Sequence, residues 1–182
     1  MQAILEAAEH ERWLQRLGIR VAAVISNKTE AHGLAHAQQA GLHTEVIEHQ
    51  KFDSREAFDM ALMRGIDRHS PALVVLAGFM RILTPAFVRH YQGRLVNIHP
   101  SLLPAFAGLH THRRAIESGC RVAGATVHLV TAELDHGPIL AQAVVPVLPE
   151  DTEHTLAARV RTQEHLIYPQ AIRGLLERPP AC

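Results

Sequence analysis

The stretch "LVNIHPSLLP", residues 95–104, places Asn97 and His99 two positions apart at the end of an apolar run. Residues i and i+2 of a β-strand point to the same side, so the carboxamide and the imidazole would stand next to each other. Pro100 cannot donate a ladder hydrogen bond, so the strand is expected to end there. Strand ends of open α/β sheets often carry the chemistry of such folds. The pattern therefore predicts a polar pair at the end of a buried strand.

Asp135 is the third candidate, in the loop "ELDHGP" between two further apolar runs. A carboxylate beside a histidine fixes its tautomer and prepares it to move a proton. An asparagine amide can donate to a developing oxyanion. With no Ser or Cys nucleophile in a recognisable context, the three groups suit acyl transfer to a nucleophile that the substrate brings. The alternative is structural: Asn97 satisfies a backbone group and His99 is an ordinary buried, hydrogen-bonded histidine.

A metal site is the competing use of these side chains. His110 and His112 in "GLHTH" could join His99 and Asp135 as ligands. No H-x-x-x-H helix and no Cys/His cluster among these residues supports such a site, so we expect no metal here.

Glu164 interrupts the apolar face of the last predicted helix. That face carries Leu156, Val160 and Ile167. A carboxylate on such a face needs a partner. It could pair with Arg55 or Arg161, or it could accept hydrogen bonds from the hydroxyls of a sugar.

Alternating apolar strands and amphipathic helices must position these residues. We expect strands within 18–27 and 71–79, at 95–99, and at 122–130 and 138–147, with helices over 1–17, 53–66, 84–91 and 151–176. Asp53 and Glu56 form a capping box for the second helix. The pattern predicts an α/β protein, a three-layer sandwich with a mostly parallel twisted sheet of Rossmann-like type.

The composition limits the possible partners and location. The 182 residues carry 18 Lys+Arg and 18 Asp+Glu, so a nucleic-acid or anionic-membrane surface is not expected. No apolar run is long enough to cross a bilayer, and the first residues do not have the pattern expected of a signal peptide. With only Cys120 and Cys182, a reduced cytoplasmic protein is the simplest interpretation.

Several stretches together resemble the phosphoribosylglycinamide formyltransferases, folate-dependent enzymes of purine synthesis. The matching stretches are "SNK" at 26–28, "FDSREAFD" at 52–59, "VVLAGFMRILTPAFV" at 74–88, "GRLVNIHPSLLPAFAGLHTHRRAIESG" at 93–119, "GATVHLVTAELDHGPILAQAVVPV" at 124–147 and "RVRTQEHLIYP" at 159–169. The Asn-x-His pair and the aspartate alone are shared with other formyl-folate enzymes. "GLHTH" and "TQEH" favour the glycinamide enzymes.

The resemblance implies a reaction and three catalytic roles. A formyl group would pass from 10-formyltetrahydrofolate, the co-substrate, to the amine of glycinamide ribonucleotide in de novo purine biosynthesis, without a metal. Asn97 would steady the formyl oxygen in the tetrahedral intermediate, and His99 would act as general acid or stabilise the oxyanion as a cation. Asp135 would hold His99 protonatable and relay a proton through water.

The resemblance also implies two sets of substrate contacts. The folate would lie against Arg55, Met80, Arg81, Ile82, Leu83, Asn97, Thr131, Ala132, Glu133, Leu134 and Asp135. The nucleotide would lie against Gly78, Arg161, Thr162, Gln163 and Glu164. The expected partners are these small molecules, with no nucleic acid and no membrane, for a monomer or a homodimer.

The family also begins with a strand and a Gly/Ser phosphate loop ahead of the residues that match Gln2-Ala3-Ile4, and it has a further C-terminal segment. We therefore expect one formyltransferase domain over 1–182, truncated at its N-terminus and at its C-terminus relative to the family. Two alternatives stay open. The chain could be a formyltetrahydrofolate deformylase that uses water as the acceptor, or a fragment that binds folate without catalysis.

Overall fold

The computed structural model describes residues 1–177, so Cys182 lies outside the described residues. The chain divides into two compact units. Unit 1 comprises residues 1–74 and 78–91, and unit 2 comprises residues 75–77 and the chain from residue 92 onward.

Unit 1 is built from helices and one parallel strand pair. Strands β1 (Ala23–Ser26) and β2 (His43–Val46) pair in parallel, with Ala23 opposite His43. The helices are α1 (Gln2–His10), α2 (Trp13–Leu17), α3 (His32–Gln39), the 3-10 turn η1 (His49–Lys51), α4 (Arg55–Asp67) and α5 (Pro85–His90). Its buried apolar side chains include Ile4, Trp13, Leu34, Phe58, Leu62, Phe87 and Tyr91.

The predicted single helix over 1–17 is wrong, because the chain breaks it in two. Arg12 has φ +54°, a left-handed conformation that ends the α-helical hydrogen bonding of α1. The turn buries the Trp13 ring, and the indole Nε1–H donates to Glu11 Oε2 at 3.0 Å. Burial of this large aromatic side chain offsets the cost of the left-handed residue.

The cap of α4 also differs from the expectation. Ser54, one residue after Asp53, is the N-cap, and its Oγ accepts from Ala57 N at 3.1 Å. Phe58 and Leu62, one helical turn apart on α4, are buried. The shift by one residue follows from having two good capping residues in succession.

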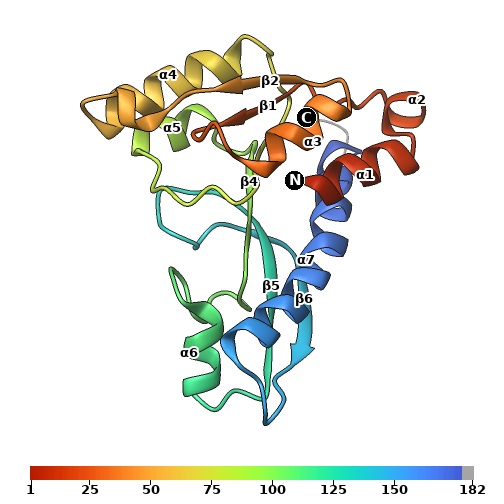
Figure 1. The fold of residues 1–182 in the computed structure, drawn as a ribbon, viewed down its shortest axis with the longest axis vertical. Helices are drawn as coiled ribbons and strands as arrows, with labels where there is room; N and C mark the ends of the chain where they lie inside the picture. Colours follow the sequence, from red (N-terminus) through yellow and green to blue (C-terminus); the bar gives the residue numbers. More distant parts are fainter. Residues whose placement is uncertain (178–182) are drawn as a thin grey trace. The chain divides into compact units, whose positions relative to one another are not determined.

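Unit 2 is a sheet covered by one long helix (Figure 1). The sheet order is β3 (Val74–Leu76), β4 (Leu95–His99), β5 (Val122–Leu129) and β6 (Ile139–Pro146). Both β4–β5 and β5–β6 are antiparallel. Helix α6 (Thr111–Glu117) lies between β4 and β5 in the chain, and α7 (Glu153–Leu176) follows β6. The predicted α/β class is confirmed; strand direction is parallel in β1–β2 and antiparallel over the last three strands.

Helix α7 packs on β5 and β6 through a small apolar core. The core comprises Ala123, Ala125, Val145, Leu156 and Val160. At the other end of the helix, buried Tyr168 Oη lies 2.7 Å from Leu76 O and 3.1 Å from Val96 O. Burial raises the pKa of this phenol well above its usual value. The hydroxyl therefore keeps its proton and ties α7 to β3 and β4.

No helix among residues 1–177 is long and apolar enough to span a membrane.

Candidate active site

Strand β4 delivers Asn97 and His99 as predicted, at its last residues before Pro100. The antiparallel register sets Asn97 opposite His128 and His99 opposite Thr126 of β5. His99 is buried at 7% exposure, whereas Asn97 is half-buried. The Asn97 carboxamide makes no hydrogen bond to any residue of the described chain, so the structural explanation, in which it satisfies a backbone group, does not apply there.

The Asp135 carboxylate lies beside both β4 and β5. Its Oδ2 is 3.5 Å from His99 Nδ1 and accepts from Gly108 N at 2.9 Å. Its Oδ1 is 3.8 Å from His128 Nε2. Asp135 itself has φ +56°, a conformation that non-glycine residues rarely adopt. The loop thus holds an unusual backbone geometry that aims this carboxylate at two histidines.

His99 meets an acceptor on each side of its ring. Nε2 lies 3.1 Å from Phe106 O, and Nδ1 faces the Asp135 carboxylate. Carbonyl and carboxylate oxygens accept only, so a ring that carries both protons satisfies both contacts. The geometry therefore suits a histidine that donates a proton or acts as a cation.

His128 is a part of this cluster that sequence reasoning missed. It is 1% exposed, and burial is the main cause that lowers its pKa, opposed by the Leu129 carbonyl and by Asp135 and aided by His99. Its Nδ1–H donates to Leu129 O at 3.0 Å, while Nε2 has no hydrogen-bond partner among the described residues. In the sequence, the only indication of its importance was that it follows Thr126 by two residues on an otherwise apolar strand.

Buried Thr126 fixes the segment that follows His99. Its hydroxyl donates to Ser101 O at 2.7 Å and accepts from Leu103 N at 3.0 Å and from Gln142 Nε2 at 2.9 Å. These bonds satisfy polar groups that would be costly to bury unpaired. They also hold the chain between His99 and Phe106 in place.

Glu164 lies on α7, half-buried on the same side as Leu156 and Val160. Burial raises the pKa of this carboxyl, and the charges of Arg161 and His99 partly oppose that rise. Glu164 forms no hydrogen bond or ion pair within the described part of unit 2, so an ion pair with Arg161, one of the alternatives that the sequence left open, is not formed. Thr162 is exposed and donates to Ala158 O, and Gln163 is half-buried.

The remaining predicted folate residues of unit 2 form the exposed loop before Asp135. They are Thr131, Ala132, Glu133 and Leu134. Thr131 Oγ1 donates to Glu133 O at 3.2 Å, and Leu134 is 56% exposed. Gly137, just beyond, is closely enclosed: a Cβ there would lie 1.6 Å from Leu129 O.

The predicted folate residues of unit 1 lie on α4 and on the loop before α5. Met80 and Ile82 are 80% and 64% exposed, so this loop presents apolar side chains to solvent. The other folate residues of this unit are Arg55, which is exposed, and Arg81 and Leu83, which are half-buried. Gly78, predicted to contact the nucleotide, has φ +70°.

Helix α4 holds this loop through two contacts that the sequence did not reveal. The buried Asp59 carboxylate accepts from Thr84 N at 2.7 Å. The Arg81 guanidinium lies over the Phe58 ring at 5.5 Å. A buried carboxylate bonded to a backbone N–H and a cation over an aromatic face both favour one loop conformation.

The competing metal site is not assembled. His99, His110, His112 and Asp135 do not form a group with metal-ligand spacing in residues 1–177. His110 is exposed at the start of α6, while His112 is half-buried.

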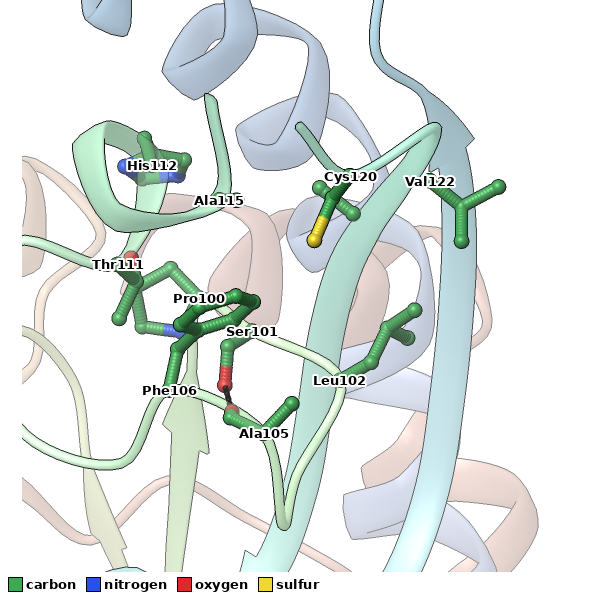
Figure 2. A pocket seen from close by; sticks show the side chains of 11 residues that line it. Pro100, Ser101, Leu102, Ala105, Phe106, Thr111, His112, Ala115, Cys120 and Val122 are labelled. Carbon is green, nitrogen blue, oxygen red and sulfur yellow. Dashed lines mark hydrogen bonds between the residues drawn. The ribbon is translucent and has the colours of Figure 1, made fainter. Parts of the chain in front are cut away.

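Unit 2 also has a pocket beside α6, with a volume of about 190 Å³ (Figure 2). Its walls are mostly apolar, and Ser101, one of the lining residues, donates to Ala105 O at 2.6 Å. Ligand pockets typically enclose about 300–1,000 Å³. Neither Asn97, His99 nor Asp135 lines this pocket, so it is too small and wrongly placed to be the reaction site.

The chain is similar to known formyltransferases over nearly its whole length. The formyl transferase profile matches residues 1–172. The chain is 54% identical to the phosphoribosylglycinamide formyltransferase of Escherichia coli, over 94% of this chain and 79% of that protein. It is 44% identical to the trifunctional purine biosynthetic protein adenosine-3 of Drosophila melanogaster over 97% of this chain, but spans only 13% of that longer protein.

A solved structure gives the same result. The glycinamide ribonucleotide transformylase 1 of Symbiobacterium toebii superposes with a TM-score of 0.91 at 45% identity, over 97% of this chain and 81% of that one. A profile match over most of the chain, together with close relatives in sequence and fold, leaves one conclusion: this chain belongs to the formyl transferase family.

Proposed function

We propose that this chain transfers a formyl group from 10-formyltetrahydrofolate to the amine of glycinamide ribonucleotide, a step of de novo purine biosynthesis. The observation that supports this proposal most directly is the cluster of polar side chains at the end of β4. There the His99 imidazole lies between the Asp135 carboxylate and a backbone carbonyl, in a chain of the formyl transferase family.

The proposed chemistry is direct acyl transfer. The substrate amine attacks the formyl carbon, a C–N bond forms, and the carbonyl oxygen becomes an oxyanion. Asn97 Nδ2–H and His99 Nε2–H donate to that oxygen; for this, the His99 Nε2–H exchanges its contact with Phe106 O for one with the substrate. Collapse breaks the bond to the folate nitrogen, which takes up a proton as the amine gives one up.

Asp135 has two roles in this proposal. Its contact with His99 Nδ1 keeps the second ring nitrogen oriented as a donor. Its carboxylate also accepts the amine's proton, through water, and returns it to the leaving nitrogen. The hydrogen bond from Gly108 N supports this position by holding Oδ2 while the other oxygen stays available.

The substrate contacts are part of the proposal. In unit 2, Thr131 to Asp135 would meet the edge of the pterin, and Arg161 to Glu164 would meet the nucleotide, with Glu164 accepting from ribose hydroxyls. The carboxylate of Glu164 forms no hydrogen bond to the described residues of unit 2, and burial raises its pKa; both support this role, because a sugar would supply hydrogen bonds.

In unit 1, Arg55 and Met80 to Leu83 would meet the folate, and Gly78 would allow close approach of the nucleotide. The exposed side chains of Met80 and Ile82 support this assignment, since exposed apolar groups favour a planar ligand. A single formyltransferase domain over 1–182, a cytoplasmic location, and a monomer or homodimer stay predictions.

The test is an assay of folate deformylation with and without glycinamide ribonucleotide. We expect formylated nucleotide and free tetrahydrofolate to appear together, and only when the nucleotide is present. His99→Ala and Asp135→Asn should each lower kcat by about 10²-fold or more, the usual range for general acid–base groups. Glu150→Gln, on an exposed loop of unit 2, is the matched control and should keep wild-type turnover.

Three outcomes would contradict the proposal. Equal deformylation without the nucleotide would make the chain a deformylase. Folate binding without turnover would make it a non-catalytic binder. Near-normal turnover of either variant, at unchanged stability, would remove the assigned catalytic roles.

A further inference from the structure

We infer that unit 1 carries a binding site for a transition-metal ion at His43, Glu45 and His69, independent of the formyl-transfer chemistry. One ring nitrogen of each histidine and one carboxylate oxygen of Glu45 lie within 4.8 Å of one another. Among residues 1–177 this is the one such group of three.

Two elements bring the three side chains together. His43 and Glu45 stand at positions i and i+2 of β2, so they project to the same side of the strand. His69 follows the C-terminus of α4. Glu45 lies against the last turns of that helix, because a Cβ on Gly65 would meet its two carboxylate oxygens at 3.6 and 3.7 Å.

The two histidine rings form no hydrogen bond to the residues that the structure describes. Their rings lie 5.1 Å apart between centroids, tilted by 48°. His69 Nε2 is buried without a hydrogen bond to any described residue. A buried polar nitrogen without a partner is costly, and a bound cation would satisfy a ligand nitrogen here.

The local charges also favour a cation. The C-terminus of α4 ends at Asp67, two residues before His69, and presents the negative end of a 13-residue helix. Arg68 opposes this, since its Nη2 lies 2.6 Å from both oxygens of Glu45. The side chain of Arg68 is 59% exposed and can turn away from a metal-bound Glu45.

The donor set indicates the class of metal. Two imidazoles and one carboxylate suit Zn²⁺, Co²⁺ or Ni²⁺ and not Mg²⁺ or Ca²⁺, which prefer oxygen ligands. With bonds of about 2.0–2.2 Å, tetrahedral ligand atoms lie roughly 3.4 Å apart. Because the ligand atoms already lie within 4.8 Å of one another, no pair has to approach by more than about 1.4 Å, which side-chain rotation can supply. Water would complete the coordination.

The test is titration of the untagged chain with ZnCl₂ alone by isothermal calorimetry, followed by Co²⁺ absorption spectra. We expect one Zn²⁺ per chain at the tightest site, a rise in Tm on adding Zn²⁺, and visible Co²⁺ bands of tetrahedral type. Loss of an outer-shell partner already costs a metal site about 10–100-fold in affinity. His43→Ala and His69→Ala should therefore each weaken binding at least tenfold.

The matched control is His10→Ala, an exposed histidine at the end of α1 of the same unit. It should bind Zn²⁺ as the wild type does. Because His43 is exposed, His43→Ala should keep its fold, and thermal unfolding without metal checks this. Arg68→Ala should bind Zn²⁺ at least as tightly as the wild type. Equal Zn²⁺ affinity in the wild type and the His43→Ala/His69→Ala double variant would overturn the inference.

Formyl transfer does not enter this test. Loss of the metal site in His43→Ala should leave turnover unchanged, so failure of one proposal leaves the other intact.

Discussion

At the scale of single residues, the cluster at the end of β4 contains two histidines around one carboxylate. Both His99 and His128 face Asp135, at 3.5 and 3.8 Å, through different oxygens. Burial lowers the pKa of His128, so its ring is neutral near pH 7, and its Nδ1–H already serves Leu129 O. The carboxylate thus has one partner suited to carry charge and one that stays neutral.

The neutral His128 Nε2 has no proton to donate to Asp135, so we expect His128 to affect that carboxylate by packing beside it, without touching the substrate. His128→Gln should lower kcat about tenfold, equivalent to roughly 1.4 kcal/mol, with little change in the KM for the nucleotide. The measurement is steady-state kinetics from pH 6 to 9. A purely structural role for His128 would change Tm without changing the shape of the pH–rate profile. An unchanged profile and kcat at equal stability would count against this assignment.

Glu164 illustrates a conflict between stability and binding. Burial raises the pKa of its carboxyl, so the ionised form is disfavoured in the folded chain. Its contribution to stability is greatest below the unfolded pKa of 4.5 and is lost as pH rises through the folded pKa. At pH 7.5 the charged carboxylate therefore destabilises the folded chain. Such a cost in stability is common at residues that bind a substrate.

Glu164→Gln should separate the two effects. The Tm at pH 7.5 should rise, and the gain should disappear near pH 4. The KM for the nucleotide should rise about tenfold or more, because a hydrogen bond to a charged group is worth roughly 1.5–3 kcal/mol. Calorimetric melting and initial-rate kinetics measure both. A lower Tm at pH 7.5, or an unchanged KM, would contradict one half of the argument.

At the scale of elements, glycines at helix ends and helix interiors have different tasks. Gly119 follows α6 with φ +67°, whereas Gly174 lies inside α7, where an added Cβ would meet no other atom within 4 Å. Left-handed backbone favours glycine, but a helix interior loses stability through glycine's extra freedom in the unfolded chain.

The same substitution should therefore have opposite signs at these two sites. Gly174→Ala should raise the free energy of unfolding by about 0.5–1 kcal/mol, and Gly119→Ala should lower it by about 1 kcal/mol. Urea unfolding of the two variants beside the wild type measures the difference. Two changes of the same sign would show that backbone preference does not decide stability at these helices.

Element types were predictable from the sequence, whereas local breaks were not. The strand that ends in Asn97 and His99, the pair β5–β6 and the helix α7 follow from apolar periodicity. The break of the first helix at Arg12 depends on burying Trp13, a tertiary effect. Strands β1 and β3 are shorter than the apolar runs that contain them. An apolar composition indicates only that a segment is buried, whereas the hydrogen bonds of a strand also require a neighbouring strand beside each residue.

The candidate site divides in the same way. His99 and Asn97 could be found from their i, i+2 spacing, and Asp135 from its loop. His128 and Asp59 could not be singled out, because one polar residue in an apolar segment is usually a satisfied core residue. Only the fold reveals that one faces Asp135 and the other holds the loop before Thr84.

At the scale of the whole molecule, zero net charge and 14 histidines make the response to mild acid a property of histidine burial. Burial lowers the pKa of His112 as well as that of His128, and at His112 Glu153 opposes this effect while Arg161 and His99 add to it. When the pKa of a histidine is lower in the folded chain than its value of 6.5 in the unfolded chain, the unfolded chain binds a proton more readily than the folded chain does. Stability contributed by these neutral rings is therefore present above pH 6.5 and falls as pH drops below it.

Two carboxyl groups affect the stability of the folded chain in other pH ranges. The contribution of Glu164 to the stability of the folded chain grows as pH falls toward 4.5, which opposes the destabilising effect of the histidines. Removal of its charge in Glu164→Gln should therefore make the loss of stability in acid steeper. The pKa of Asp151 is held far below 3.8 by its hydrogen bonds from Arg159, Leu148 N and Thr155, so its contribution is lost only in strong acid. Between pH 7.5 and 5.5, then, the histidines set the sign of the change.

We accordingly expect the midpoint of urea unfolding to fall between pH 7.5 and 5.5, and His112→Gln to reduce that fall. The half-buried His112 ring, whose Nε2 is buried without a hydrogen bond to the described residues, must remain neutral in the folded chain, and glutamine has no proton to resist. His154→Gln, an exposed change at the start of α7, serves as the control and should keep the wild-type pH dependence. If His112→Gln and His154→Gln lose stability in parallel with the wild type, buried histidines do not govern the acid response, and exposed charge alone must account for it.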